Sequence, residues 1–251
     1  MRHLVIPDTQ IKYGEDLTFL TWIGKYIVDK KPDVVIHLGD FADLPSLSSY
    51  DVGKKSFEGR RYVKDIKAVV EGMSLLLQPL NEFNIKARKN KEKQYKPRLV
   101  LTLGNHEQRI ERAVENDPKL EGLISYEDLP YKNWEVYPFL SPVVIDNVVY
   151  CHYYPSGILG RPITSASCMV SKLHMSCIAG HQQGRQVAYG KKADGTNITC
   201  IIAGSCYNHE EGYLNVQTNN HWRGLIMLNE VQDGSFDEMF VSLKYLKEKY
   251  G

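Results

Sequence analysis

Four consecutive residues of this 251-residue chain, Gly104, Asn105, His106 and Glu107, have the types and spacing of a reaction centre. They follow the apolar run 98–103, so a strand ending there would turn at the glycine and deliver three polar side chains to one point. An amide oxygen can bind a metal, an imidazole can donate a proton, and a carboxylate can hold either in place. A purely structural strand end has little use for all three, so the tetrapeptide indicates a catalytic site.

Four further apolar runs end in a similar way, with an oxygen or imidazole ligand just beyond the last apolar residue. The runs are 4–6, 33–38, 143–151 and 175–179, and the ligands after them are Asp8 with Gln10, Asp40, His152, and His181 with Gln183. In open α/β sheets, ligands bind in the crevice beyond the carboxyl ends of the strands. We therefore expect the five strand ends to meet at one site.

This ordered set of motifs resembles the calcineurin-like metallophosphoesterase superfamily. The motifs are Asp8-x-Gln10, Gly39-Asp40, Gly104-Asn105-His106-Glu107, His152 and Gly180-His181-x-Gln183, and they lie between residue 1 and about residue 206. The stretch 44–62 resembles the members of this family that bacteriophages encode. The resemblance implies hydrolysis of phosphate esters with two divalent metal ions. It also implies an α/β fold, a four-layer sandwich of two mixed β-sheets flanked by helices. We expect one such domain over residues 1–251, with a helical and basic insertion at about 44–97.

The metal ligands follow from the resemblance, with one departure. The implied sites are Asp8, Gln10, Asp40 and Gln183 for the first ion, and Asp40, Asn105, His152 and His181 for the second, with Asp40 bridging. The family pattern has histidines where this chain has Gln10 and Gln183. Oxygen ligands suit Mn²⁺ or Mg²⁺, whereas imidazole suits zinc, iron or nickel. We therefore expect the first site to hold Mn²⁺ or Mg²⁺ weakly, while Ni²⁺, Fe²⁺ and Zn²⁺ remain candidates for the pair.

Two other interpretations of the glutamines stay open. In one, the first site is vestigial and the enzyme works with a single metal. In the other, the chain is a non-catalytic phosphate-binding module. The retained His106 argues against the second of these, because a binding module does not need a proton donor there.

The resemblance also implies roles at the reaction centre. Two bound cations clamp the attacking and leaving oxygens and make hydroxide available near neutral pH. Asp40 would fix their spacing, Asn105 would touch metal and phosphate, and His106 would protonate the leaving oxygen. Glu107 and Asp43 would support these side chains from behind.

Other residues are candidates for binding the substrate. Arginine binds phosphate in a bidentate manner, and Arg60, Arg61 and Arg109 lie close to the motifs in sequence. His209 follows the apolar run 198–202, which could reach the same sheet edge. Each of these side chains could equally be an ordinary loop or surface residue.

The segment 86–98 is strongly basic in a chain of balanced charge, with 31 Lys and Arg against 30 Asp and Glu. It could be a solvated helix end or a docking patch for a nucleic-acid backbone. Its one aromatic residue, Tyr95, does not make a base-stacking platform. The net charge of +1 predicts no overall attraction to nucleic acid or membrane.

Three functions fit these observations. The favoured one is a phosphodiesterase or nuclease acting on nucleic acid or nucleotides. The alternative is a phosphomonoesterase acting on proteins or small molecules, and the second alternative is the non-catalytic module. The sequence does not separate endonuclease from exonuclease action, and it predicts no oligomeric state.

Composition places the expected enzyme in the cytoplasm, the host cytoplasm if a phage encodes it. Five cysteines without Cys-x-x-Cys spacing predict buried free thiols in a reducing compartment. The chain has no apolar run long enough for a membrane span, and the stretch at its start is too short for a signal peptide.

Helical periodicity predicts helices over 15–31 and 60–88, the second broken or kinked near Pro79. The segment 222–250 predicts two strands around Asp233 and Gly234, followed by a short basic tail. We expect this hairpin to complete the second sheet.

Overall fold

The computed structural model describes residues 1–212 and 216–251, and its centre is a six-stranded sheet. The strand order is β13-β12-β1-β2-β3-β4, with β1 to β4 parallel and the β12–β13 hairpin antiparallel. The strands are β1 (His3–Ile6), β2 (Val34–His37), β3 (Arg98–Thr102), β4 (Glu135–Tyr137), β12 (Gly224–Gln232) and β13 (Ser235–Ser242).

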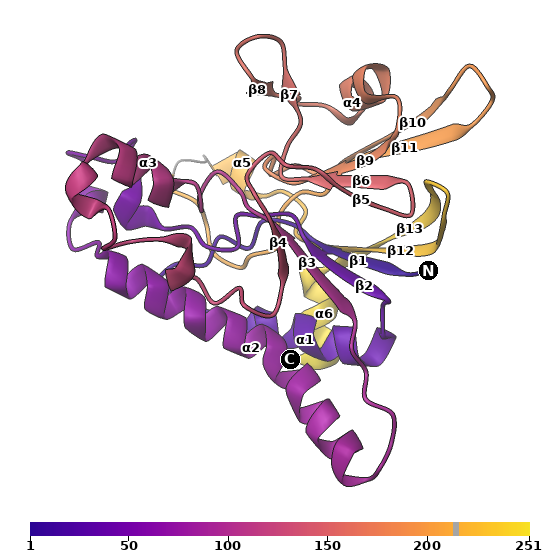
Figure 1. The fold of residues 1–251 in the computed structure, drawn as a ribbon, viewed down its shortest axis with the longest axis horizontal. Coiled ribbons are helices and arrows are strands. Elements are labelled where there is room, and N and C mark those ends of the chain that lie inside the picture. The colour runs from indigo at the N-terminus through magenta and orange to yellow at the C-terminus, as the bar shows by residue number, and fades with distance from the viewer. Residues whose placement is uncertain (213–215) are drawn as a thin grey trace.

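A second sheet of five strands packs on the first, in the order β10-β11-β9-β6-β5 (Figure 1). Here β11, β9 and β6 are parallel, and the two edge strands are antiparallel. The strands are β5 (Val143–Ile145), β6 (Val148–Cys151), β9 (Ser176–Ala179), β10 (Gln186–Lys191) and β11 (Asn197–Ile202). A separate small hairpin, β7 (Pro155–Ser156) with β8 (Arg161–Pro162), projects beyond this sheet (Figure 1).

Alternation along the strands sorts side chains between three buried layers. In β1, Val5 packs between the two sheets, whereas Leu4 and Ile6 pack against helices. In β6, Tyr150 packs between the sheets and Val149 faces the other way. Successive residues of a strand point to opposite faces, so strands that are apolar on both faces require cover on both sides.

Helices provide that cover. The outer face of the first sheet carries α1 (Thr18–Lys30), α2 (Tyr62–Lys89) and α6 (Leu243–Tyr250), and the outer face of the second carries α4 (Ala166–Leu173) (Figure 1). Two further short helices are α3 (Arg109–Asn116) and α5 (Val216–Asn219). The predicted four-layer arrangement of two mixed sheets flanked by helices is confirmed.

We expected the last hairpin to join the second sheet, and this prediction was wrong. The hairpin around Asp233 and Gly234 forms as expected, but β12 pairs with β1 in the first sheet, with Leu4 opposite Met227. Five consecutive buried residues at the start of β12 fit a strand inside a sheet that is covered on both faces. The expected basic tail is the helix α6, whose Leu243 and Leu246 are buried.

The long predicted helix is α2, which is 28 residues long and includes Pro79. It connects β2 to β3, because parallel neighbouring strands require a crossover connection. It also packs along α1, where Gly24 is in contact with it. At about 1.5 Å per residue, α2 spans roughly 42 Å. The basic segment 86–98 therefore lies at the opposite end of α2 from Arg61, near the start of β3 (Figure 1).

No helix in the described part of the chain is long and apolar enough to cross a membrane. All five cysteines are free thiols, and four of them are buried.

Candidate active site

The predicted metal ligands lie on loops that leave both sheets at the same edge. Asp8, Gln10 and Asp40 follow β1 and β2 of the first sheet, while His152 and His181 follow β6 and β9 of the second. Backbone hydrogen bonds tie neighbouring loops together: Gln10 N donates to Asp40 O at 2.8 Å, and Gly180 N donates to His152 O at 2.9 Å. The loop after β11 reaches the same edge, where Cys206 N donates to Asp8 O at 2.8 Å.

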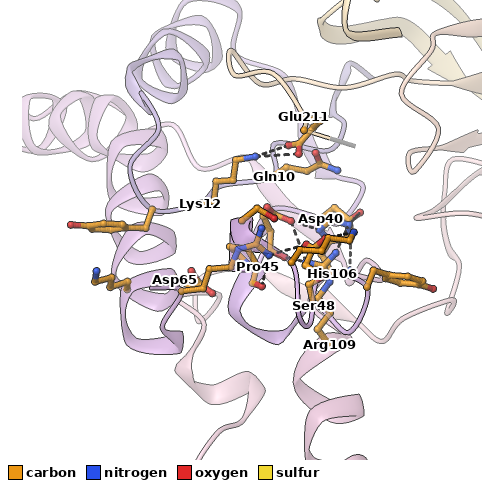
Figure 2. A pocket seen from close by; sticks show the side chains of 18 of the residues that line it. Gln10, Lys12, Asp40, Pro45, Ser48, Asp65, His106, Arg109 and Glu211 are labelled. Carbon is orange, nitrogen blue, oxygen red and sulfur yellow. Dashed lines mark hydrogen bonds and ion pairs between the residues drawn. The ribbon is translucent and has the colours of Figure 1, made fainter. Parts of the chain in front are cut away.

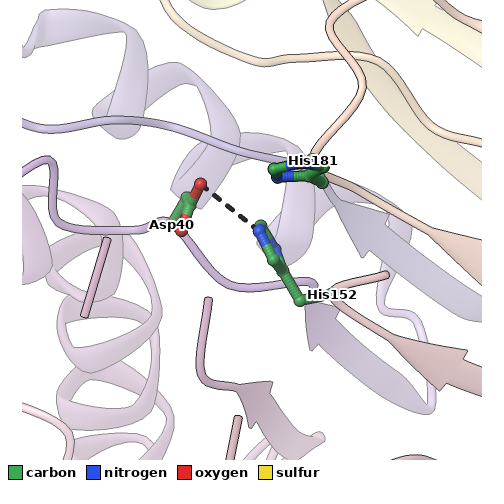
Figure 3. Close-up of side chains that lie close together, drawn as sticks. All are labelled: Asp40, His152 and His181. Carbon is green, nitrogen blue, oxygen red and sulfur yellow. Dashed lines mark ion pairs between the residues drawn. The ribbon is translucent and has the colours of Figure 1, made fainter. Parts of the chain in front are cut away.

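Asp40, His152 and His181 form a compact cluster whose ligand atoms lie within 4.8 Å of one another (Figure 3). Asp40 Oδ2 is 3.4 Å from His152 Nε2. Asn105 joins them, because its Oδ1 is 2.9 Å from His152 Nε2 and 2.8 Å from His181 Nδ1. These are the four residues expected to hold the second ion.

Hydrogen bonding and charge prepare the two imidazoles for this task. His152 Nδ1 donates to Leu38 O at 2.8 Å, which fixes the ring and turns Nε2 toward Asp40. Burial lowers the pKa of His152, but the carboxylate of Asp40 outweighs it and raises that pKa to about 9. Burial and the neighbouring His152 lower the pKa of His181 to about 4, so His181 is a neutral imidazole at pH 7. The high pKa of His152 means that a cation binding here displaces its proton.

The residues of the first site carry unsatisfied oxygens. Asp8 Oδ2 and Gln10 Oε1 are buried without a hydrogen-bond partner in the described structure. The other carboxylate oxygen of Asp8 accepts from His181 N at 3.0 Å, and burial raises the pKa of Asp8 to about 7. Gln183 Oε1 accepts from the Tyr207 hydroxyl at 2.8 Å. Buried polar atoms normally find partners, so this set of oxygens fits a hard divalent cation.

The backbone at the site is held in unusual conformations. Gln10, Asp40 and His181 have φ of 43°, 50° and 64°, the left-handed region that non-glycine residues rarely adopt. A Cβ on Gly104 would lie 2.1 Å from Asp40 Oδ1, and one on Gly180 would lie 2.5 Å from Asp8 Oδ1. Strain of this kind clusters at functional sites. Asp and His are among the non-glycine residues enriched in the left-handed region, so Asp40 and His181 are of compatible types, whereas Gln10 is not.

Glu107 holds the loops after β2 and β3 together from beneath. Its buried carboxylate accepts from the backbone N–H groups of Asp40, Ala42 and Gly104 at 2.9, 2.9 and 2.8 Å. The Tyr131 hydroxyl donates a fourth hydrogen bond at 3.0 Å. Tyr131 was missed in the sequence, because it lies far along the chain and outside any motif.

His106 lies beside the cluster with Asp43 behind it. Its Nδ1 is 2.7 Å from Asp43 Oδ1, and its Nε2 is 3.8 Å from Asp40 Oδ2. Burial lowers the pKa of His106, yet Asp40 and Asp43 together raise it above the ordinary value. Arg109 donates to Asp43 O at 2.6 Å and lies 3.2 Å from His106 Nε2. A protonated imidazole next to the ligand cluster is suited to donate a proton.

Comparison with known proteins identifies the family. A family model described as calcineurin-like phosphoesterase matches residues 1–186. The chain belongs to the calcineurin-like phosphoesterase family. Members of this family are metal-dependent phosphoesterases, which is the class that the motifs predicted.

A bacteriophage protein is among the relatives of this phosphoesterase. The Gene 54 protein of Mycobacterium phage L5 is 41% identical over 64 residues, which are 26% of this chain and 25% of that protein. The match thus covers about a quarter of the length of the relative. It agrees with the resemblance of the sequence to phage-encoded members.

The ligand cluster of the phosphoesterase opens into a cleft of about 1120 Å³ (Figure 2). Asp40 and His106 lie at its inner end, and the ion pair of Lys12 with Glu211, at 3.0 Å, lies on one wall. The cleft is also lined by the three arginines expected to bind substrate, Arg60, Arg61 and Arg109.

Three of the four predicted substrate contacts, Arg60, Arg109 and His209, already contact carboxylates of the protein. Arg60 is paired with Asp51 at 2.8 Å and donates to Pro45 O at 3.0 Å. His209 is stacked on Tyr207, and its Nε2 is 2.5 Å from Glu211 Oε1. His209 is not among the described residues that line the cleft, whereas Glu211 is.

Proposed function

We propose that this phosphoesterase is a divalent-metal-dependent phosphodiesterase that acts on nucleic acid or nucleotides. The cleft is the observation that supports this most directly. Its volume of about 1120 Å³ exceeds the roughly 300–1,000 Å³ of most small-molecule sites. A diester carries a group on each side of the phosphorus and can use that space, whereas a small phosphomonoester cannot. The phage relative supports the proposal that the enzyme acts in the cytoplasm of a bacterial host.

We assign the ligands as the motifs suggested: Asp8, Gln10, Asp40 and Gln183 for one ion, and Asp40, Asn105, His152 and His181 for the other. The oxygen ligands of the first site favour Mn²⁺ or Mg²⁺ there. When bound, the ions stabilise charge on the phosphoryl oxygens and lower the pKa of bound water. The unpartnered oxygens of Asp8 and Gln10 support a cation at the first site rather than a vestigial one.

In this proposal the protein moves one proton. His106 donates from Nε2 to the leaving oxygen, while Asp43 accepts from Nδ1 and keeps the ring in that orientation. Arg109 donates to Asp43 O and, in the metal-free fold, to Nε2 of His106. For Nε2 to carry the proton, Arg109 must turn from Nε2 to a phosphate oxygen. Glu107 keeps the loops that carry Asp40 and His106 at a fixed separation.

The test compares a diester with a monoester. Metal-stripped protein is refilled with Mn²⁺, Mg²⁺, Ni²⁺ or Zn²⁺ and given bis-p-nitrophenyl phosphate or p-nitrophenyl phosphate. We expect Mn²⁺ to support faster turnover of the diester. Faster turnover of the monoester would point to a phosphomonoesterase. If folded protein turns over neither substrate with any metal, the non-catalytic phosphate-binding module is the remaining interpretation.

The same test includes His106→Ala, with His174→Asn at an exposed histidine as control. General acid catalysis is worth about 10²–10⁴-fold, so we expect a loss of that order on an oligonucleotide. The loss should be smaller on bis-p-nitrophenyl phosphate, because p-nitrophenolate leaves without a proton. Equal losses on both substrates would contradict the acid role of His106.

A further inference from the structure

Cations line the cleft well beyond the metal ligands, and most of them are neutralised by the protein. Lys12 is paired with Glu211 at 3.0 Å, and Arg109 with Asp43 at 3.3 Å. Asp51 forms ion pairs with both Lys54 and Arg60, at 2.9 and 2.8 Å. Arg61 and Lys64 also line the cleft, and neither forms an ion pair within the described part of the chain.

Arg61 and Lys64 come from one short stretch at the start of α2. The Arg61 side chain donates to the adjacent Arg60 O at 2.7 Å, and both side chains are exposed. Because the other cations that line the cleft are already paired, a phosphate can reach Arg61 and Lys64 without first breaking a protein ion pair. The carboxylates of Glu58 and Asp65 line the same stretch and offset part of this positive charge.

Two tyrosines accompany these charges. Tyr13 and Tyr50 line the same cleft and are 57% and 79% exposed, so their rings are open to a ligand. The Lys64 ammonium lies 5.1 Å from the centre of the Tyr13 ring. An open ring next to a free cation offers one surface for a base and another for its phosphate.

We propose that Tyr13, Tyr50, Arg61 and Lys64, here called the outer cleft, bind a single strand of nucleic acid next to the scissile phosphate. Arg61 and Lys64 hold a neighbouring phosphate, and the tyrosine rings stack on unpaired bases. This inference rests on the proposed phosphodiesterase function and specifies its substrate as single-stranded nucleic acid or an unpaired end.

The aromatic rings decide between kinds of partner. Bases in a duplex are stacked on one another and cannot lie on a tyrosine, whereas a single strand exposes them. A phosphopeptide would use the two cations but has no need of exposed rings. Glu58 lines the same part of the cleft and forms no ion pair in the described structure, so it repels phosphate there.

The test is fluorescence anisotropy of a labelled single-stranded oligonucleotide over a range of salt concentrations. It uses Mn²⁺-loaded protein carrying His106→Ala to slow cleavage, and a gel checks that the strand stays intact. Arg61→Ala with Lys64→Ala removes two phosphate contacts, so the slope of log affinity against log salt should fall by about 1.4, at roughly 0.7 per contact. Tyr50→Ala should weaken binding about 5- to 150-fold, and Tyr50→Phe should preserve it, since stacking needs the ring and not the hydroxyl.

Three comparisons make the result specific. Glu58→Gln should tighten binding, the opposite direction from the cation variants. Lys93→Ala with Lys96→Ala removes two charges from the basic segment at the far end of α2 and should leave the slope unchanged. A duplex of the same sequence should bind more weakly, and Tyr50→Ala should not affect it.

The proposal for the outer cleft is wrong if Arg61→Ala with Lys64→Ala leaves the slope of log affinity against log salt unchanged. It is also wrong if only Lys93→Ala with Lys96→Ala lowers that slope. A duplex that binds as well as the strand, or a phosphopeptide that displaces the strand from folded protein, would also overturn it. Failure of the proposed function appears separately, as absence of bis-p-nitrophenyl phosphate hydrolysis by the unmutated protein. Circular dichroism of every variant confirms that it is folded.

Discussion

At the scale of single residues, Gln10 and Gln183 are the proposed ligands that stand where the resemblance implies histidines. Gln10 Oε1 is buried and unpartnered, and Gln183 Oε1 is 2.8 Å from the Tyr207 hydroxyl. An oxygen with one hydrogen bond still has a lone pair for a cation. In the proposed assignment, each position thus keeps an atom that can ligate a metal, with an amide oxygen in place of an imidazole nitrogen.

Restoring the imidazoles should change which metal binds. We expect Gln10→His with Gln183→His to raise the affinity for Zn²⁺ at least tenfold, about 1.4 kcal/mol, because imidazole suits zinc better than an amide does. Competition titration with a zinc indicator measures this. Gln182→His places an imidazole next to the site as a control, and an equal gain there would show that Gln10 and Gln183 do not bind the metal.

The pair of His106 and Asp43 makes a prediction about pH. Asp40 and Asp43 raise the pKa of His106 against the effect of burial, and the acid form is the one that donates. Activity should therefore fall as pH rises through this raised pKa. Asp43→Asn removes a negative charge, so it should move that fall to lower pH in the pH–rate profile. The surface variant Asp29→Asn should not move it, and an unchanged profile in Asp43→Asn would remove Asp43 from this role.

At the scale of elements, Glu107 joins the loops that follow β2 and β3. Its four hydrogen bonds make the separation of Asp40 and His106 a property of two loops rather than of either alone. A carboxylate that receives several backbone N–H groups in a buried site is rigid, and one lost donor leaves it partly unsatisfied.

Tyr131→Phe removes one of those donors. A hydrogen bond to a charged group is worth about 1.5–3 kcal/mol, so we expect a loss of that size in the free energy of unfolding. Tyr26 is the matched control, because its hydroxyl is buried without a partner and Tyr26→Phe leaves nothing unsatisfied. Denaturant unfolding gives both values, and equal losses would mean that the Tyr131 hydroxyl is not supporting Glu107.

The contact between α1 and α2 depends on a missing side chain. A Cβ on Gly24 would lie 2.4 Å from Leu76 O and 2.9 Å from the Pro79 ring. In an exposed helix Gly→Ala stabilises by about 0.5–1 kcal/mol, but here overpacking should reverse the sign and cost about 1–3 kcal/mol. Gly184→Ala, with no atom within 4 Å of the added carbon, is the control. A stabilised Gly24→Ala protein in thermal unfolding would show that the helices can separate there without loss.

At the scale of the whole molecule, the proposed metal centre would link the two sheets. Its proposed ligands leave β1, β2 and β3 on one side and β6 and β9 on the other. A cation held by both sets binds the folded state and not the unfolded chain, so it stabilises the packing of sheet on sheet. At a free concentration of 100 times the dissociation constant, this amounts to about 2.7 kcal/mol.

Stability should therefore depend on metal and pH together. The pKa values of Asp8 and His152 are raised to about 7 and about 9 in the metal-free fold. A raised pKa gives stability at low pH that is lost between the unfolded and the folded pKa. Metal-free protein should therefore lose stability from pH 3.8 to about 7 through Asp8, and from pH 6.5 to about 9 through His152. Binding needs the deprotonated ligands, so the gain in melting temperature from Mn²⁺ should grow over the same range. A gain that shrinks or stays constant would contradict this assignment.

The sequence alone determined the chemistry and the local elements. A strand end, a turning glycine and the polar residue after it are neighbours in the chain, so Asp40, Asn105 and His181 could be found by position. Short continuous apolar runs identified β1, β2, β3, β6 and β9, and helical spacing identified α1 and α2. Membership of the family follows from the same ordered motifs.

Tertiary structure decided what depends on contacts between distant segments. The residues of the β12–β13 hairpin fit either sheet, so its own sequence does not determine that it pairs with β1 of the first sheet. Tyr131 reaches Glu107, and Glu211 reaches Lys12, across long stretches of chain that carry no shared pattern. Asp40 has a left-handed backbone and lies so close to Gly104 of another loop that a Cβ on Gly104 would be 2.1 Å from Asp40 Oδ1. Local sequence specifies which groups are present, whereas packing of the two sheets sets their distances, and the distances control the chemistry.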